Sequence, residues 1–188
     1  MAVNWLQHSR LVQSAHAIAR GEVVAYPTEA VWGLGCDPFD QSAVQRILNL
    51  KRRPANKGLI LVAADISQFN FLLNTLSKAQ LATLQLSWPG HTTWLVPHNN
   101  RVPYLLSGSH STIALRVSAH PLVRALCLLN RGPIVSTSAN PQGLPPARSA
   151  LKVRCYFGTD NLVYAPAAPA IAQEPSTIKD LISGEQLR

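Results

Sequence analysis

Short apolar runs alternate with amphipathic stretches along most of this chain, and this alternation restricts its fold more than any other feature. Residues 23–26, 58–63 and 133–136 are apolar runs with Gly or Pro at or near one end, which is typical of buried β-strands. Apolar residues within 11–19 recur at helical spacing and are followed by Gly21, a common helix stop. Strands that alternate with helices predict an α/β layer structure.

Polar segments at the ends of these strands predict where a ligand would bind. In an open α/β sheet, the loops at the carboxyl ends of the strands line the ligand crevice. Residues 27–29 and 136–140 leave strands, whereas residues 51–57 enter one, so a mixed sheet is expected. Residues 31–35 are expected to form an irregular, glycine-rich segment, and residues 165–175 an extended, proline-rich connector.

The composition limits the class of protein. The 188 residues are 47% hydrophobic and fit a single domain over residues 1–188. No apolar run reaches the ~18 residues of a membrane helix, and residues 1–20 lack the apolar centre of a signal peptide. Cys36, Cys127 and Cys155 fit neither a disulfide framework nor a zinc site. A cytoplasmic location without a membrane partner is therefore expected.

The formal net charge of +8 results from nine acids against seventeen Lys and Arg residues. Such a balance favours anionic partners, which are nucleotides, nucleic acid or anionic lipid. Apart from residues 51–53 the basic residues are scattered, so the sequence shows no basic tail of the kind that grips nucleic acid or membranes.

Lys51, Arg53 and Lys57 form the most basic segment, directly before the apolar run at residues 58–63. The arginine fork and the lysine point charge both suit phosphate oxygens. In the alternative interpretation these residues only complement the dipole at a helix end. Pro54 restricts the loop before the strand, and both interpretations stay open.

Two groups of small polar residues follow predicted strands. Ser136, Ser138 and Asn140 occupy alternate positions, so their hydroxyl and amide groups can face one ligand, although Ser and Asn are also common helix caps. Thr28 and Glu29 combine a hydroxyl with a carboxylate, which suits an amino-acid or sugar group. An ordinary turn is the alternative there.

Thr112 and Arg116 lie on one face of the strand predicted at residues 112–117. An arginine that points inward from a sheet needs an anionic partner, either an acid or a ligand carboxylate. Because the chain has few acids, a ligand is the expected partner.

Signatures of other chemistries are absent from the sequence. Residues 33–35 lack the third glycine of a dinucleotide fingerprint, and Lys57-Gly58 is not the order of a P-loop. No Gly-x-Ser-x-Gly elbow occurs, and the six histidines have no metal-ligand spacing. Catalysis by a protein nucleophile or by a protein-bound metal is therefore not expected.

Five segments occur in this order: Tyr26-Pro27-Thr28-Glu29-Ala30-Val31-Trp32-Gly33-Leu34-Gly35, Lys51-Arg52-Arg53-Pro54, Ala114-Leu115-Arg116-Val117, His120-Pro121-Leu122 and Ser136-Thr137-Ser138-Ala139-Asn140. Together they resemble the YrdC/TsaC family of threonylcarbamoyl-AMP synthases, in its short single-domain bacterial form. The resemblance covers roughly residues 21–146, and Pro175-Ser176-Thr177-Ile178 extends it. The chain departs from many relatives at Ala30, Val62 and Ser118.

The resemblance implies a twisted mixed β-sheet flanked by helices, with an open, positively charged concave face. It implies that L-threonine, bicarbonate (or CO2) and ATP give threonylcarbamoyl-AMP and diphosphate, with Mg²⁺ carried by ATP and no protein-bound metal or organic cofactor. The product would feed the t6A modification at position 37 of tRNA, through a separate complex of the TsaB, TsaD and TsaE kind.

The resemblance also implies roles for individual residues. ATP binding falls on Lys51, Arg53, Lys57, Thr112, Ser138 and Asn140, and Lys51 and Arg53 are also the expected catalytic residues. Threonine binding falls on Thr28, Ala30, Arg116, Ser136 and Ser176.

Two other functions remain open at this point. One is a non-catalytic module that binds tRNA or structured ribosomal RNA, as the charge of +8 allows. The other is a carbamoyl-adenylate domain cut from a hydrogenase-maturation carbamoyltransferase, which would require carbamoyl phosphate as substrate.

Overall fold

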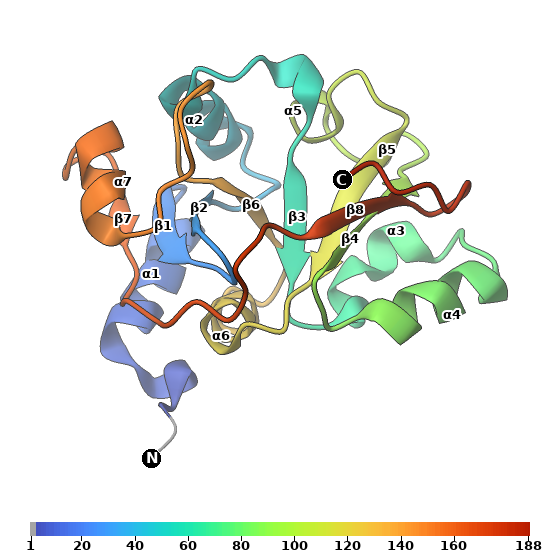
Figure 1. Ribbon diagram of the computed structural model, residues 1–188, viewed down its shortest axis with the longest axis horizontal. Coiled ribbons are helices and arrows are strands. Elements are labelled where there is room, and N and C mark those ends of the chain that lie inside the picture. Colours follow the sequence, from blue (N-terminus) through green and yellow to red (C-terminus); the bar gives the residue numbers. More distant parts are fainter. Residues whose placement is uncertain (1–2) are drawn as a thin grey trace.

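The computed structural model describes residues 3–188, so residues 1 and 2 of the expected single domain lie outside the described residues. Within that range one sheet has the strand order β7-β1-β2-β6-β3-β5-β4-β8 (Figure 1). The strands are β1 (Val24–Pro27), β2 (Trp32–Gly35), β3 (Ile60–Ala63), β4 (Thr92–Pro97), β5 (Thr112–Val117), β6 (Ile134–Ser138), β7 (Val163–Tyr164) and β8 (Thr177–Asp180). The α-helices are α1 (Ser9–Ala19), α2 (Gln41–Lys51), α3 (Asn70–Leu73), α4 (Lys78–Ser87), α5 (Tyr104–Ser107), α6 (Pro121–Leu129) and α7 (Ala150–Phe157). Short 3-10 helices are η1 (Trp5–Gln7), η2 (Ala55–Lys57) and η3 (Ile66–Phe69).

The sheet is mixed, which confirms the prediction. β1 pairs with β7, β3 with β5, and β4 with β8 in parallel, whereas the other neighbouring strands are antiparallel. This arrangement places the carboxyl ends of β1 and β6 at the same edge as the amino ends of β3 and β5. The polar segments that leave β1 and β6 therefore lie near the basic segment that enters β3.

The glycine-rich segment after β1 is a strand, and the prediction of an irregular segment there was wrong. β2 pairs in antiparallel with both β1 and β6. A Cβ atom at Gly35 would lie 2.6 Å from the carbonyl oxygen of Val135 and 2.8 Å from the ring of Tyr26. Glycine in this strand therefore marks a close approach of neighbouring groups and not a break in the sheet.

Helix α7 was not predicted from the sequence. Ser149 caps it, with its Oγ accepting from the backbone N–H of Lys152 at 3.2 Å. Only Val153 and Phe157 of the helix are buried, and Leu151 is 70% exposed. The apolar positions therefore do not repeat clearly enough to indicate a helical face.

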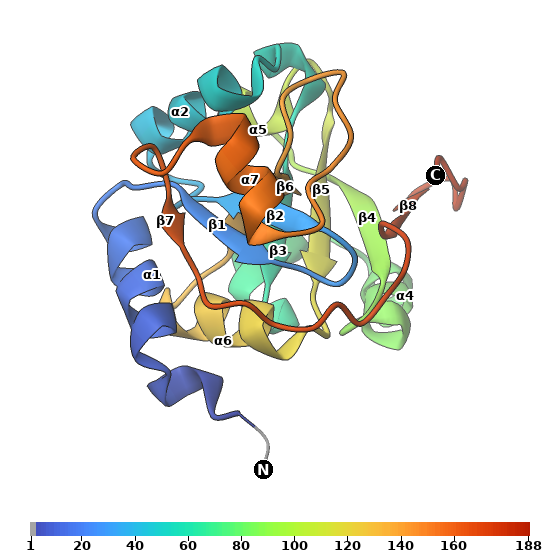
Figure 2. The ribbon, with the colours of Figure 1, turned by 60° about the vertical axis from the view of Figure 1, so that its left-hand side comes forward.

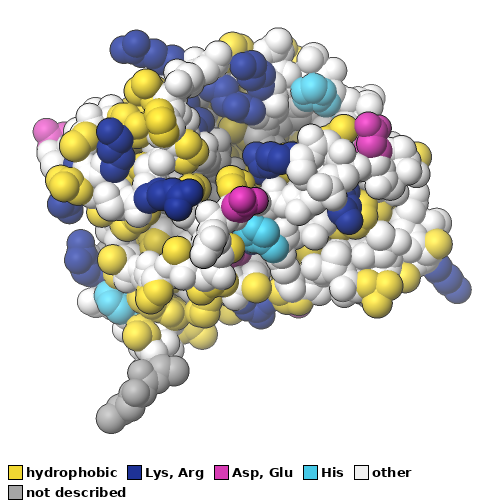
Figure 3. All heavy atoms as spheres, in the orientation of Figure 1, with side chains coloured by type: hydrophobic (Ala, Val, Ile, Leu, Met, Phe, Trp, Pro, Cys, Tyr) yellow, Lys and Arg dark blue, Asp and Glu magenta, His cyan; other side chains and the backbone are white. Residues whose placement is uncertain are grey.

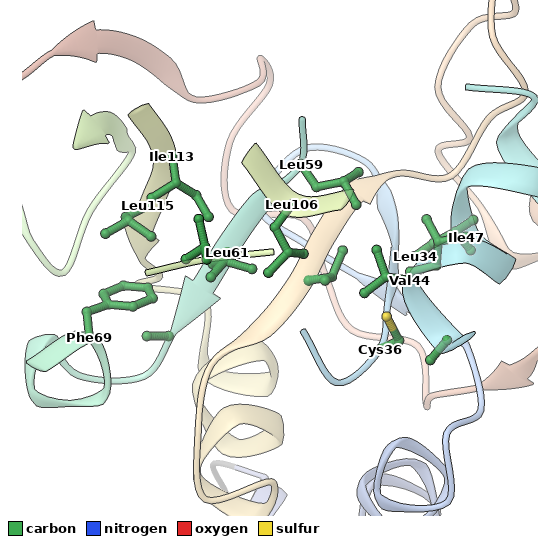
Figure 4. Packing of buried hydrophobic residues seen from close by; sticks show 14 of the residues in the cluster. Leu34, Cys36, Val44, Ile47, Leu59, Leu61, Phe69, Leu106, Ile113 and Leu115 are labelled. Atoms are coloured by element: carbon green, nitrogen blue, oxygen red, sulfur yellow. The ribbon is translucent and has the colours of Figure 1, made fainter. Parts of the chain in front are cut away.

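Two apolar clusters hold the helices against the sheet. In the larger one, side chains of β2, β3 and β5 such as Leu34, Leu61 and Leu115 pack with Ile47 of α2 and Leu106 of α5 (Figure 4). The smaller cluster joins α1 and α6 to β1, β3 and β6 on the opposite face (Figure 2). α1 and α6 cover only part of that face, and the remainder holds the candidate site.

Within residues 3–188, none of the helices combines the length and the apolar character that a membrane crossing requires.

Candidate active site

An open cavity of about 390 Å³ lies over the uncovered part of the sheet. The β1–β2 loop, the entry of β3, the first half of β5, the end of β6 and residues around the start of β8 form its wall. The charged residues that line it are Arg53, Lys57, Arg116 and Arg188, against the single acid Glu29. Figure 3 shows Lys and Arg side chains around a hollow on this face of the molecule. This excess of positive charge favours an anionic ligand.

The cavity brings together most of the residues that the sequence singled out. Those that line it are Thr28, Ala30, Arg53, Lys57, Thr112, Arg116, Ser136, Ser138 and Ser176. Lys51 and Asn140 are not among the lining residues and lie behind the wall formed by the end of β6.

Lys51 is the last residue of α2, and its ammonium group is buried beneath the loop that leaves β6. Nζ donates to the backbone carbonyls of Ser138 and Asn140, the latter at 2.9 Å, and the residue is 3% exposed. Burial, followed by the nearby charge of Arg53, lowers the pKa of Lys51 to about 8. Lys51 therefore holds the loop in place and adds positive charge from behind the cavity wall.

Arg53 reaches the cavity from the loop between α2 and β3. Its Nε and Nη2 donate to the carbonyl of Gly58 at 3.2 and 2.9 Å. Gly58 has a φ of 61°, and a Cβ atom there would lie 2.9 Å from the carbonyl oxygen of Ser107, so only glycine allows this tight loop. Burial lowers the pKa of Arg53, but an arginine keeps its charge at neutral pH. Within residues 3–188, Nη1 has no protein partner and is available to an anion.

Asn140 directs its amide group into the turn that follows β6. Nδ2 donates to the carbonyls of Leu144 at 2.6 Å and Pro141 at 3.1 Å, and among the described residues Oδ1 is buried without a partner. In this conformation Asn140 stabilises the turn, and Ser138 is the member of the Ser-x-Asn pair that faces the cavity.

Arg116 has the acid Glu29 as its partner, whereas the small number of acids in the sequence had favoured a ligand over an acid. Its Nη2 lies 2.5 Å from Oε1 of Glu29 and 3.4 Å from Nδ1 of His91, and its Nε donates to the carbonyl of Gly90 at 2.9 Å. Glu29 and Arg116 are both buried, with 4% and 8% exposure. The number of acids in the sequence could not reveal this ion pair, because the pair joins two segments that are far apart in the chain, the β1–β2 loop and β5.

Hydrogen bonds hold several hydroxyl groups of this region in fixed orientations. The phenol of Tyr26 donates to Oγ of Ser136 at 2.7 Å, and Oγ atoms of Ser176 and Thr93 share a hydrogen bond of 2.9 Å. Burial raises the pKa of Tyr26, so the phenol stays a neutral donor. Thr28 donates its hydroxyl to a carbonyl of its own loop at 2.7 Å. These contacts fix the orientation of groups that can bind a small polar ligand.

Sequence reasoning missed Arg188 and His91 as cavity residues. The guanidinium of Arg188 donates to the carbonyl of Ser176 at 3.0 and 3.2 Å, because the chain after β8 folds back beside it through a bridge between Lys179 and Gln186. Neither residue belongs to a motif, and only the tertiary fold brings them to the site.

The connector at residues 165–175 crosses the open face and is tied to the site. The backbone N–H groups of Ile171 and Ala172 donate to the carbonyl of Glu29 at 2.9 and 2.8 Å. Nε2 of His91 donates to the carbonyl of Glu174 at 2.8 Å. The connector therefore positions the β1–β2 loop and His91 beside Arg116.

Because the pKa of Lys51 is lowered from 10.5 to about 8, we expect the affinity for a nucleoside triphosphate to fall as the pH rises through about 8. Deprotonation of Lys51 removes a positive charge beside the cavity. The free energy of unfolding should rise as the pH increases from about 8 to 10.5, because the unfolded protein, with its higher Lys51 pKa, binds more protons over this range. Titration calorimetry with ATP at several pH values tests this expectation. A Lys51→Met variant should show a flatter pH profile, and an equally steep one would contradict the assignment to Lys51.

The cavity of this mixed-sheet α/β protein combines three arginines and a lysine with small hydroxyls, a set of groups that suits a phosphorylated ligand. Comparison with known proteins identifies the family. The chain belongs to the Sua5/YciO/YrdC family, whose model, described as "Telomere recombination", matches residues 16–188.

Similar proteins are named threonylcarbamoyl-AMP synthase. The protein from Saccharophagus degradans is 51% identical over 98% of this chain and 97% of its own length. The protein from Stutzerimonas stutzeri is 52% identical over 95% of this chain and 96% of its own length. These relatives and the family model confirm the predicted family.

A solved structure also resembles this chain. Sua5 of P. abyssi complexed with L-threonine superposes with a TM-score of 0.81 at 33% identity. The match covers 90% of this chain and 50% of that protein, so the chain spans about half of its length. This similarity confirms the predicted α/β fold.

Proposed function

We propose that this chain is a threonylcarbamoyl-AMP synthase, a nucleotidyltransferase that converts L-threonine, bicarbonate or CO2 and ATP into threonylcarbamoyl-adenylate and diphosphate. One observation carries the proposal: a single cavity joins Arg53 and Lys57, which suit phosphates, to Arg116 and Ser136, which suit an amino acid. The names of the relatives and the threonine complex of P. abyssi Sua5 support it. The product would serve t6A modification at position 37 of tRNA in the cytoplasm, through a complex of the TsaB, TsaD and TsaE kind.

The chemistry joins two anions. The amine of threonine takes up CO2 or bicarbonate to form an N-carboxylate, which attacks the α-phosphorus of ATP in line while diphosphate leaves. Arg53, Lys57 and the buried Lys51 offset the repulsion between carboxylate and triphosphate. Holding both reactants in one cavity lowers the barrier further, by up to about 7–11 kcal/mol in favourable intramolecular cases.

Mg²⁺ enters this scheme as part of the ATP substrate. Over residues 3–188, no group of three or more His, Cys, Asp or Glu side chains is placed to hold a metal ion. We propose that the phosphates of ATP bring the cation into the cavity, because Mg²⁺ is usually bound through substrate phosphates with few protein ligands.

We expect purified protein to release diphosphate from ATP only when L-threonine and bicarbonate are both present. Mass spectrometry should detect threonylcarbamoyl-AMP as the product. Replacing Arg53 with alanine should reduce kcat/KM for ATP by about 100-fold or more, because a positioned charge at the phosphates is removed. A requirement for carbamoyl phosphate would favour the carbamoyltransferase alternative. Salt-sensitive RNA binding without turnover would favour the RNA-binding alternative.

A further inference from the structure

Glu29 is the only acid among the residues that line a cavity with four cations. It lies in the β1–β2 loop and is 4% exposed. An acid in this place weakens the attraction of the cavity for phosphates. Its burial is also unfavourable unless hydrogen bonds and opposite charge compensate. A role in binding a cationic group would explain its position.

The two carboxylate oxygens of Glu29 have different surroundings. Oε1 lies 2.5 Å from Nη2 of Arg116 and accepts a hydrogen bond of 2.6 Å from Oγ of Ser118. Ser118 also accepts from the backbone N–H of His120 at 3.0 Å, so the donor is itself held in place. Among residues 3–188, Oε2 has no hydrogen-bond partner. Oε2 is not a fully buried atom, and Glu29 is one of the residues that line the cavity, so this oxygen is accessible to a ligand there.

Arg116 shows the complementary pattern. Its Nε and Nη2 are occupied by the carbonyl of Gly90, by Glu29 and by His91, whereas Nη1 has no partner in the described part of the chain. Both residues line the cavity, so the ion pair leaves it one unoccupied guanidinium NH2 group and one unoccupied carboxylate oxygen. An α-amino acid is a zwitterion that carries its carboxylate and its ammonium group on one carbon, so its charges match this pair.

We propose that Glu29 binds the α-ammonium group of the amino-acid substrate through Oε2 and accepts its proton, while Nη1 of Arg116 binds the α-carboxylate. This inference rests on the proposed function. The ammonium N–H bond breaks, its electron pair stays on nitrogen, and the proton passes to Oε2. The free amine then forms an N–C bond with CO2 to give the N-carboxylate, and the second amine proton leaves to solvent. With bicarbonate, water is released instead.

Other groups around Glu29 bear on its pH response. Arg116 from β5 and Arg188 beyond β8 remain charged over the neutral range. Burial raises the pKa of Tyr26 in β1 and of Cys127 in α6, so both stay neutral. His91 lies between the carbonyl of Glu174, which is 2.8 Å from Nε2, and Nη2 of Arg116, which is 3.4 Å from Nδ1.

The test compares Glu29→Gln with Ser118→Ala, which keeps the carboxylate and removes only its hydroxyl donor. Glu29→Gln should lower kcat/KM for L-threonine by about 100-fold or more at neutral pH, which is the usual contribution of general acid–base catalysis. The remaining rate should rise about tenfold per pH unit up to about pH 9, as free amine becomes available without a base. Ser118→Ala should lose less than about tenfold and keep the pH profile of the unmodified protein.

Equilibrium binding supplies a second readout. In the absence of ATP, so that no turnover occurs, the unmodified protein should prefer L-threonine to 2,3-dihydroxybutanoate, in which a hydroxyl replaces the amine. Glu29→Gln should lose this preference while its affinity for ATP stays unchanged. An unchanged preference and an unchanged pH profile would overturn the role of Glu29, whereas failure of the unmodified protein to make any product would overturn the proposed function. Should Glu29→Gln not fold, Glu29→Asp moves the carboxylate away from the ammonium group by one methylene, and a kcat/KM for L-threonine within about twofold of the unmodified protein would then contradict the role of Glu29.

Discussion

Replacing Lys51 with methionine is expected to abolish most activity, by about 1000-fold in kcat/KM for ATP, while the fold survives. Lys51 is not a lining residue, but its ammonium joins the carbonyls of Ser138 and Asn140 behind the cavity wall. The variant therefore loses a positive charge next to the triphosphate and also frees the loop that carries Ser138. Both effects act on the nucleotide side of the site.

Two opposing effects keep the predicted change in the free energy of unfolding of Lys51→Met small. The lowered pKa of Lys51, from 10.5 to about 8, corresponds to roughly 3 kcal/mol of unfavourable burial that methionine removes. Against this, two buried carbonyls lose a donor, at about 1–3 kcal/mol each. The net change in the free energy of unfolding should therefore stay within about 3 kcal/mol.

Steady-state diphosphate release and thermal unfolding of the same preparation measure both quantities. Lys78, at the exposed start of α4, offers a matched control, because Lys78→Met removes the same charge far from the cavity lining. That control should keep normal activity. If Lys51→Met retained more than about a tenth of the activity, the charge behind the wall would not contribute as we expect.

The sequence predicted the parts of the fold and site that depend on local pattern. Apolar runs identified β1, β3 and β6. A strand was also predicted at β5, and its alternation placed Thr112 and Arg116 on one face, where both line the cavity. The polar residues at the ends of β1 and β6 meet the basic loop before β3 because the mixed sheet brings those ends to one edge. The end of an apolar run indicates where a strand ends, and the alternation of strand residues indicates which face each side chain lies on.

Side-chain partners could not be predicted in the same way. Lys51 was predicted as a phosphate ligand, but its buried ammonium group donates to the carbonyls of Ser138 and Asn140, since a buried charge needs hydrogen-bond partners. The Glu29–Arg116 pair joins two segments that are far apart in the chain, and Arg188 reaches the cavity only because the end of the chain folds back along β8. Such contacts depend on the completed tertiary structure.

Replacing Arg116 with methionine should destabilise the protein by about 3–5 kcal/mol, because it leaves the buried carboxylate of Glu29 without its counter-charge. For a chain of this size that loss corresponds to a fall in Tm of roughly 6–20 °C. The same variant should raise KM for L-threonine by about 100-fold or more, since the donor expected to bind the carboxylate is gone. Affinity for ATP should change little.

The double variant Arg116→Met, Glu29→Gln separates these two effects. Removing both charges eliminates the unpaired buried carboxylate, so most of the lost Tm should return. Threonine binding should not return, because neither charge that matches the zwitterion remains. Differential scanning calorimetry and threonine titration on the two single variants and the double variant complete the cycle. A double variant no more stable than Arg116→Met would show that the ion pair is not the source of the loss. Recovery of threonine affinity in the double variant would show that the Glu29–Arg116 pair stabilises the fold but does not bind threonine.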